Sequence, residues 1–128
     1  MALLALLLTV ACGGGGTAVL SPHTVANRNP VDHTEQVILD TLPRQGWTAE
    51  TVQPGRIVAF FSRSAHLLRV EIRYDVQSVA IYYLDSDNLK AHLEANGQIY
   101  GHSAINRWSD TLARAIAGAL MGPAPGTP

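Results

Sequence analysis

The clearest pattern in the chain is the alternation of apolar and polar residues over residues 66–74. Leu68, Val70, Ile72 and Tyr74 fall on one side of this segment, and charged residues recur on the other. A period of two is typical of a β-strand with one buried face. The segment therefore predicts a strand whose apolar face needs a covering layer.

Three further segments predict neighbouring strands of the same sheet. A strong turn signal at Pro54-Gly55 separates the first two, and residues 75–77 are expected to form the turn before the last. Short strands joined by tight turns are typical of an antiparallel meander. We therefore predict a four-stranded antiparallel meander, whose other strands fall over residues 47–51, 57–61 and 79–83.

Amphipathic segments on either side of the meander predict two helices. The first is expected over residues 30–42, with Asn29 as its N-cap and Pro43 and Gly46 ending it. The second is expected over residues 103–120, where we expect Trp108 to pack the helix onto the sheet. The apolar stripe of this second helix consists of Ile105, Trp108, Leu112, Ala115, Ile116 and Ala119.

The predicted order of elements is α-β-β-β-β-α, an α+β fold with both helices packed on one face of the sheet. The chain has 128 residues, of which 47% are hydrophobic, and this is enough for the packed core of one domain. We expect that domain over residues 29–121. A disordered tail is expected over residues 122–128, because Gly and Pro there cannot continue the helix.

Charge and cysteine content exclude two classes of protein. Nine Lys and Arg nearly cancel ten Asp and Glu, which leaves a formal net charge of -1. Nucleic-acid binding depends on a basic surface, so we expect no nucleic-acid partner. Cys12 is the single cysteine, and it therefore excludes an internal disulfide framework and a cysteine-based zinc site.

The N-terminal region reads as a targeting segment followed by a linker. Residues 2–11 are almost entirely apolar, but a bilayer span needs about 20 residues, whereas about ten form the apolar core of a signal peptide. We expect residues 1–11 to be that signal. Glycines follow Cys12, and residues 13–28 lack apolar periodicity, so we expect a flexible tether spanning about 20–25 Å. The alternative is a buried N-terminal helix with an incidental cysteine.

The sequence Thr9-Val10-Ala11-Cys12 resembles the lipobox of bacterial lipoproteins, which ends in a small residue and the cysteine that becomes lipidated. It departs from that pattern at Thr9, where leucine is usual, and in having no Lys or Arg before the apolar run; a start codon further upstream would explain the second departure. The resemblance implies cleavage before Cys12 and a lipid anchor of diacylglycerol and an N-acyl chain such as palmitate on it. Because Gly13 is not Asp, the resemblance favours the outer membrane, facing the periplasm.

Two further segments are similar to small bacterial envelope lipoproteins of uncharacterised function. These are LPRQGW (Leu42–Trp47), where an opening helix ends in a Gly-Trp pair, and INRWSDTLARAI (Ile105–Ile116), which matches their closing helix. Ile105 stands where those proteins carry tyrosine. The resemblance implies a location in the cell envelope and no known activity.

The five histidines form no recognised catalytic or metal-binding motif, so we assign no catalytic residue, no metal and no cofactor. Residues 84–103 are the least regular segment, with a small hairpin expected around Asn96-Gly97. Long connections often carry binding groups. The candidate binding surface therefore consists of Asp87, His92, Glu94 and His102, and the remaining histidines are His23, His33 and His66.

These observations favour a membrane-anchored binding or accessory module of the cell envelope, which contacts an envelope protein or polymer. The absence of a nucleophile motif argues against an enzyme. The alternative is a small envelope hydrolase or metal-binding protein that uses His92, His102 and either Glu94 or Asp87.

Overall fold

The predicted meander is confirmed. It consists of β3 (Trp47–Gln53), β4 (Arg56–Arg63), β5 (His66–Tyr74) and β6 (Ser78–Asp87) of the computed structural model, which pair antiparallel in chain order. The structure describes residues 16–122. The predicted signal peptide, Cys12 and residues 123–128 lie outside the described residues.

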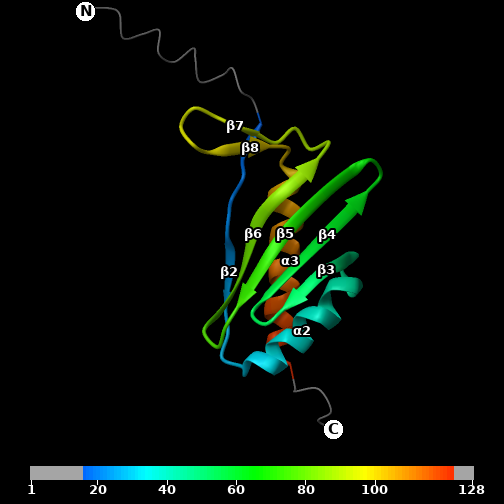
Figure 1. The fold of residues 1–128 in the computed structure, drawn as a ribbon, viewed down its shortest axis with the longest axis vertical. Helices are drawn as coiled ribbons and strands as arrows, with labels where there is room; N and C mark the ends of the chain where they lie inside the picture. Colours follow the sequence, from blue (N-terminus) through cyan, green and yellow to red (C-terminus); the bar gives the residue numbers. More distant parts are fainter. Residues whose placement is uncertain (1–15, 123–128) are drawn as a thin grey trace, which may run out of the picture.

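An additional strand, β2 (His23–Ala26), pairs with β6 and extends the sheet to five strands in the order β2-β6-β5-β4-β3 (Figure 1). The N-terminal segment also contributes β1 (Thr17–Ala18) to a second sheet. This sheet has three strands in the order β1-β8-β7, where β8 is Ile99–Gly101 and β7 is His92–Leu93. The expectation of a flexible tether over residues 13–28 is therefore wrong from residue 16 onward. The folded region begins before residue 29.

Polar contacts hold this N-terminal segment, and this explains why apolar periodicity gives no sign of it. The side chain of Asn106 accepts a hydrogen bond from the Leu20 backbone amide and donates one to the Ala18 carbonyl, both at 2.8 Å. The side-chain amide of Gln98 donates to the Val19 carbonyl at 3.0 Å. These side-chain amides add to the pairing of β1 with β8 and to the bond from the Val19 backbone amide to the Ile99 carbonyl.

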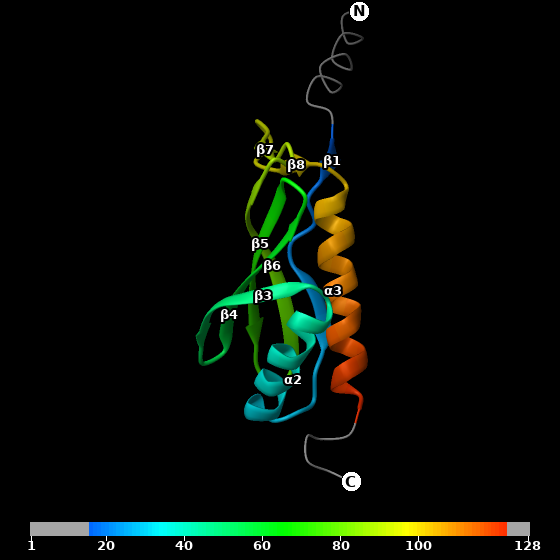
Figure 2. The same cartoon turned by 90° about the vertical axis from the view of Figure 1, so that its right-hand side faces the viewer.

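The two predicted helices are present as α2 (Val31–Arg44) and α3 (Ala104–Leu120), and both lie on the same side of the five-stranded sheet (Figure 2). The predicted N-cap is wrong. Pro30 occupies the cap position without a side-chain hydrogen bond, and the Asn29 amide instead donates to the carbonyl of Leu120 at the end of α3, at 3.2 Å. Of the two residues expected to end this helix, Pro43 lies inside the last turn of α2, and Gly46 lies two residues beyond its end with a φ of 85°.

One apolar core joins the helices to the sheet. Ile38 of α2, Leu112 of α3 and Ile72 of β5 are each fully buried in it. Trp108, expected to pack α3 onto the sheet, is only partly buried and lies against Phe61 with ring centroids 4.8 Å apart. Leu112 occupies the central position on α3 instead, and Trp108 lies at the margin of the core.

Asn27 is a buried polar residue that joins three parts of the fold. Its side-chain amide donates to the Thr34 hydroxyl on α2 and to the Asp75 carbonyl in the β5–β6 turn, both at 2.8 Å. Its side-chain oxygen accepts a hydrogen bond from the Asn29 backbone amide at 3.1 Å, and its own backbone amide donates to the Gln77 carbonyl at 2.9 Å. Its buried polar groups are therefore well paired, as buried groups need to be.

We predict that Asn27→Ala lowers the free energy of unfolding by about 2–4 kcal/mol, because it leaves buried donors and acceptors of neighbouring segments unpaired. Urea unfolding of the purified protein measures this change. Gln36→Ala, on the exposed side of α2, is the matched control and should change the free energy by less than about 0.5 kcal/mol. Equal effects of the two substitutions would contradict the structural role of Asn27.

Candidate functional site

The predicted hairpin around Asn96-Gly97 is present and positions part of the candidate binding surface. β7 and β8 pair antiparallel, with His92 opposite Tyr100, and Gly97 turns the chain at a φ of 84°. A positive φ of this size favours glycine. The hairpin therefore fixes the position of His92 at one end of the molecule.

Of the four candidate residues, His92 and Glu94 form a direct contact. Nε2 of His92 lies 2.7 Å from a carboxylate oxygen of Glu94, and its Nδ1 lies 2.9 Å from the carbonyl oxygen of Lys90. The contact with the Lys90 carbonyl, followed by the one with Glu94, raises the pKa of His92 above its ordinary value. The two side chains therefore form a salt bridge at the start of the hairpin when His92 is protonated.

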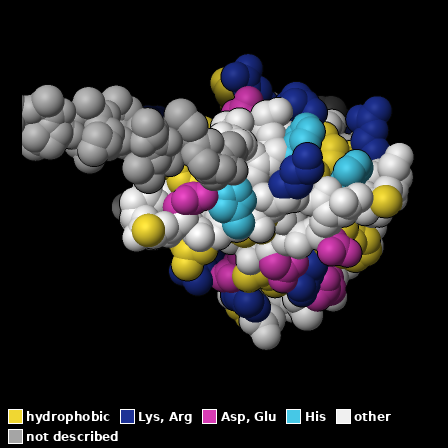
Figure 3. Space-filling model, turned by 90° about the horizontal axis from the view of Figure 1, so that it is seen from above, with side chains coloured by type: hydrophobic (Ala, Val, Ile, Leu, Met, Phe, Trp, Pro, Cys, Tyr) yellow, Lys and Arg dark blue, Asp and Glu magenta, His cyan; other side chains and the backbone are white. Residues whose placement is uncertain are grey.

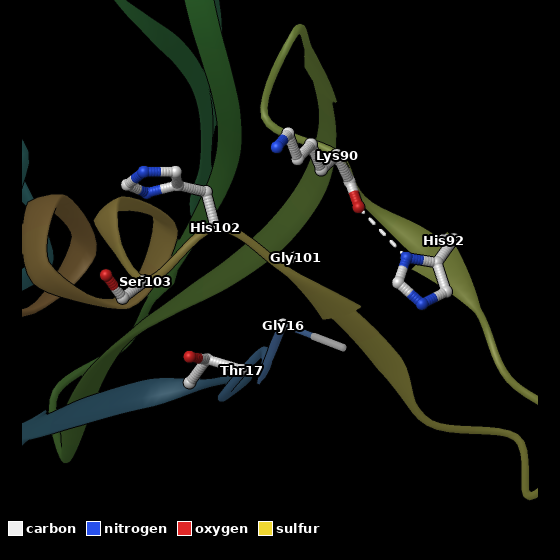
Figure 4. Close-up of a pocket in the computed structure, with 7 residues that line it drawn as sticks. All are labelled: Gly16, Thr17, Lys90, His92, Gly101, His102 and Ser103. Carbon is white, nitrogen blue, oxygen red and sulfur yellow. Dashed lines mark hydrogen bonds between the residues drawn. The ribbon is translucent and has the colours of Figure 1, made fainter. Parts of the chain in front are cut away.

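His102 and Asp87 do not join this pair. His102 lines the same shallow depression as Lys90 and His92, which has a volume of about 510 Å³, but its Nδ1 accepts a hydrogen bond from the Ala104 backbone amide at 3.0 Å. In Figure 4 the rings of His92 and His102 lie on opposite sides of Gly101, and the His102 ring points away from His92. Asp87 pairs with Leu67 at the end of β6 and does not line this depression.

Residues 16–122 contain no group of three or more His, Cys, Asp or Glu side chains that are placed to hold a metal ion. Among these residues, His92, His102 and a carboxylate are therefore not placed to hold one metal ion together. His66 is also engaged elsewhere, since its Nδ1 lies 2.7 Å from the Asn88 carbonyl oxygen.

A second surface combines aromatic and basic side chains that are far apart in the sequence. Two adjoining depressions, of about 340 and 270 Å³, share Arg63, Arg107 and Trp108. We call them together the basic–aromatic groove. His66 and His102 line its upper part, and Trp47, Phe61 and Thr111 line its lower part.

Three aromatic rings line the lower part of the groove. The ring of Phe61 lies 5.4 Å from that of Trp47 and 4.8 Å from that of Trp108, measured between centroids and with tilted planes. Trp47 is buried, whereas Phe61 and Trp108 are only partly buried. Trp47 and Phe61 therefore belong to the edge of the core, and Trp108 presents part of its indole to the groove.

The charge of the groove is one-sided. Arg63 and Arg107 form no ion pair within the part of the chain that the structure describes, although four other arginines do: Arg56, Arg69, Arg73 and Arg114. No Asp or Glu is among the described residues that line either depression. A surface with free guanidinium groups and an aromatic wall is suited to an anion that carries an apolar or ring-shaped part.

The fold creates the groove by bringing together the ends of distant elements. Arg63 is the last residue of β4, just before a turn in which Ser64 has a φ of 55°, and Arg107 lies in the first turn of α3. In the sequence Arg63 reads only as a strand end, and Arg107 reads only as part of the polar face of a helix. Their separation along the chain explains why no sequence motif joins them.

Comparison with protein-family models, curated proteins and solved structures found no match. The two lipoprotein resemblances therefore stay predictions.

We predict that an NMR titration gives His92 an imidazole pKa above the ordinary histidine value, and that Glu94→Gln lowers it only in part, because the Lys90 carbonyl is the larger cause. Since the pKa is higher in the folded chain, protonation stabilises the fold. The stabilisation from protonated His92 is complete below the pKa that His92 has in the unfolded chain, and it is lost as the pH rises through the pKa of His92 in the folded chain. A His92 pKa at or below the ordinary value would contradict the contact.

Proposed function

We propose that this protein is a lipid-anchored binding module of the bacterial cell envelope, which is held in the membrane through Cys12 and binds an anionic ligand in the basic–aromatic groove. The anchoring part of this proposal is supported by the short apolar segment that precedes Ala11-Cys12. Two or three acyl chains on one cysteine hold a protein in a bilayer stably.

One observation carries the binding role: Arg63 and Arg107 flank an aromatic wall, and no carboxylate among the described lining residues neutralises them. Unpaired guanidinium groups bind carboxylates and phosphates with two parallel hydrogen bonds. The neighbouring rings add an apolar surface for the rest of the ligand. A binding role needs no catalytic group, which agrees with the dispersed positions of His92, His102 and Asp87.

None of the helices in residues 16–122 is long and apolar enough to cross a bilayer.

We predict that the protein from a bacterial membrane fraction has the intact mass of a chain that begins at Cys12 and carries two or three acyl groups, and that Cys12→Ser removes the acyl mass entirely. The diacylglycerol is attached to the cysteine sulfur through a thioether, and serine has no sulfur with which to form this bond. Mass spectrometry of the detergent-extracted protein measures both results.

Gly13→Asp is the matched control for this experiment. It alters the neighbouring residue but keeps the thiol, and should therefore keep the acyl mass while moving the protein from the outer to the inner membrane. A Cys12→Ser protein that retains acyl groups, or a wild-type protein without them, would contradict the anchor.

A further inference from the structure

We infer that the groove binds the phosphate headgroup of anionic phospholipids, because the anchor places the mouth of the groove against the bilayer. This inference rests on the proposed function and names the ligand class of the same groove. It follows from three features: the short link to Cys12, the charge of the end of the fold that carries Gly16, and the continuity of that end with the groove.

The link between anchor and fold is short. Only residues 13–15 separate Cys12 from Gly16, the first residue that the structure describes. A fully extended chain covers at most about 3.6 Å per residue, so the Cα atoms of Cys12 and Gly16 lie within about 14 Å of each other. The next residue, Thr17, is already paired with Gly101 of β8. A lipid on Cys12 would therefore hold this end of the fold close to the headgroups.

The Gly16 end is formed by β1, the β7–β8 hairpin, the β4–β5 turn and the start of α3 (Figure 1). It carries exposed basic side chains (Figure 3). Figure 3 views this end directly: Lys, Arg and His side chains are spread over it, and Asp and Glu gather mainly along one margin. Lys90 forms no ion pair among the described residues, and the Glu94 carboxylate contacts His92. Anionic bilayers attract such surfaces.

The Gly16 end is continuous with the groove. His102 lines both the depression beside Gly16 and the upper part of the groove, and Arg63, Arg107 and Trp108 join the upper part to the lower part. The mouth of the groove therefore opens at the end that the anchor holds toward the membrane.

A phospholipid headgroup matches the order of side chains along this path. The phosphate would contact Arg63 and Arg107, since guanidinium groups bind phosphate with paired hydrogen bonds. The indole of Trp108 would lie beside the glycerol backbone, because tryptophan favours the boundary between polar headgroups and acyl chains. The side chain of Leu93, which is 71% exposed on the hairpin, adds an apolar contact at the same end.

Intrinsic fluorescence gives a direct test, because Trp47 and Trp108 are the two tryptophans of the chain and both line the groove. We predict that the full-length protein, reconstituted in vesicles of phosphatidylcholine with 30% phosphatidylglycerol, is quenched by a nitroxide on the lipid headgroup. Arg63→Gln/Arg107→Gln should reduce this quenching at least twofold. Insertion of 20 Gly and Ser residues after Gly15 should reduce it similarly, because a long link releases the orientation.

The matched control is Arg28→Gln/Arg114→Gln, which removes the same charge from residues that line neither depression of the groove. It should leave the quenching unchanged. Quenching that is equally strong in vesicles of phosphatidylcholine alone, or that is unaffected by both the arginine substitutions and the inserted link, would overturn the inference.

A second measurement separates failure of the inference from failure of the proposed function. The detergent-solubilised full chain is titrated with glycerol 1-phosphate and with galacturonate, and tryptophan fluorescence is recorded. A saturable response to glycerol 1-phosphate that is weakened at least fivefold by Arg63→Gln/Arg107→Gln supports the inference. A response to galacturonate alone overturns it but keeps an anionic ligand in the groove, and a response to neither overturns both.

Discussion

Side-chain amides that bind backbone groups of the N-terminal segment are the constraint on which the arrangement of the whole molecule depends. Asn106 and Gln98 hold residues 18–20 against α3 and the β7–β8 hairpin, and Asn27 fixes the end of β2 against α2 and the β5–β6 turn. Each amide is oriented by at least two hydrogen bonds, so its position is well defined. Because these contacts join segments that are distant in sequence, they fix the N-terminal segment, including the edge strand β2, relative to the helices on one face of the sheet (Figure 2).

This constraint also decides what an anchor at Cys12 would do. A flexible tether of sixteen residues would let the domain turn freely above a membrane, whereas only residues 13–15 lie between Cys12 and Gly16, the first residue that the structure describes. A link of this length keeps the Cα atom of Gly16 within about 14 Å of that of Cys12. Ordering of the N-terminal segment thus converts a simple attachment into a restriction on which surface faces the bilayer, and this is the physical basis for connecting the anchor to the groove.

Elements with an apolar face could be predicted from the sequence, and elements held by polar contacts could not. The meander and both helices follow from periodicity, because Ile72, Leu112 and Ile38 bury side chains at regular spacing. β1 and β2 are too short to show such spacing: both complete sheets by backbone pairing, and β1 also relies on Asn106 from the other end of the chain. Residue type alone identifies His92, Glu94 and His102 as candidates. The orientation of their side chains relative to one another depends on the hairpin turn and on the start of α3, which local sequence does not encode.

Net charge obscured the groove for a related reason. The chain is nearly neutral, but its carboxylates are distributed unevenly among its arginines. On the sheet face opposite the helices, Glu71 contacts both Arg56 and Arg73, and Glu50 and Asp85 contact Arg69. The bond from Arg73, followed by that from Arg56, lowers the pKa of Glu71, so Glu71 keeps its ion pairs to a lower pH than an ordinary glutamate would. Carboxylates held on that face cannot neutralise Arg63 and Arg107 on the other side of the sheet. A chain without net positive charge therefore presents a locally cationic groove, and only the three-dimensional placement of its acids reveals it.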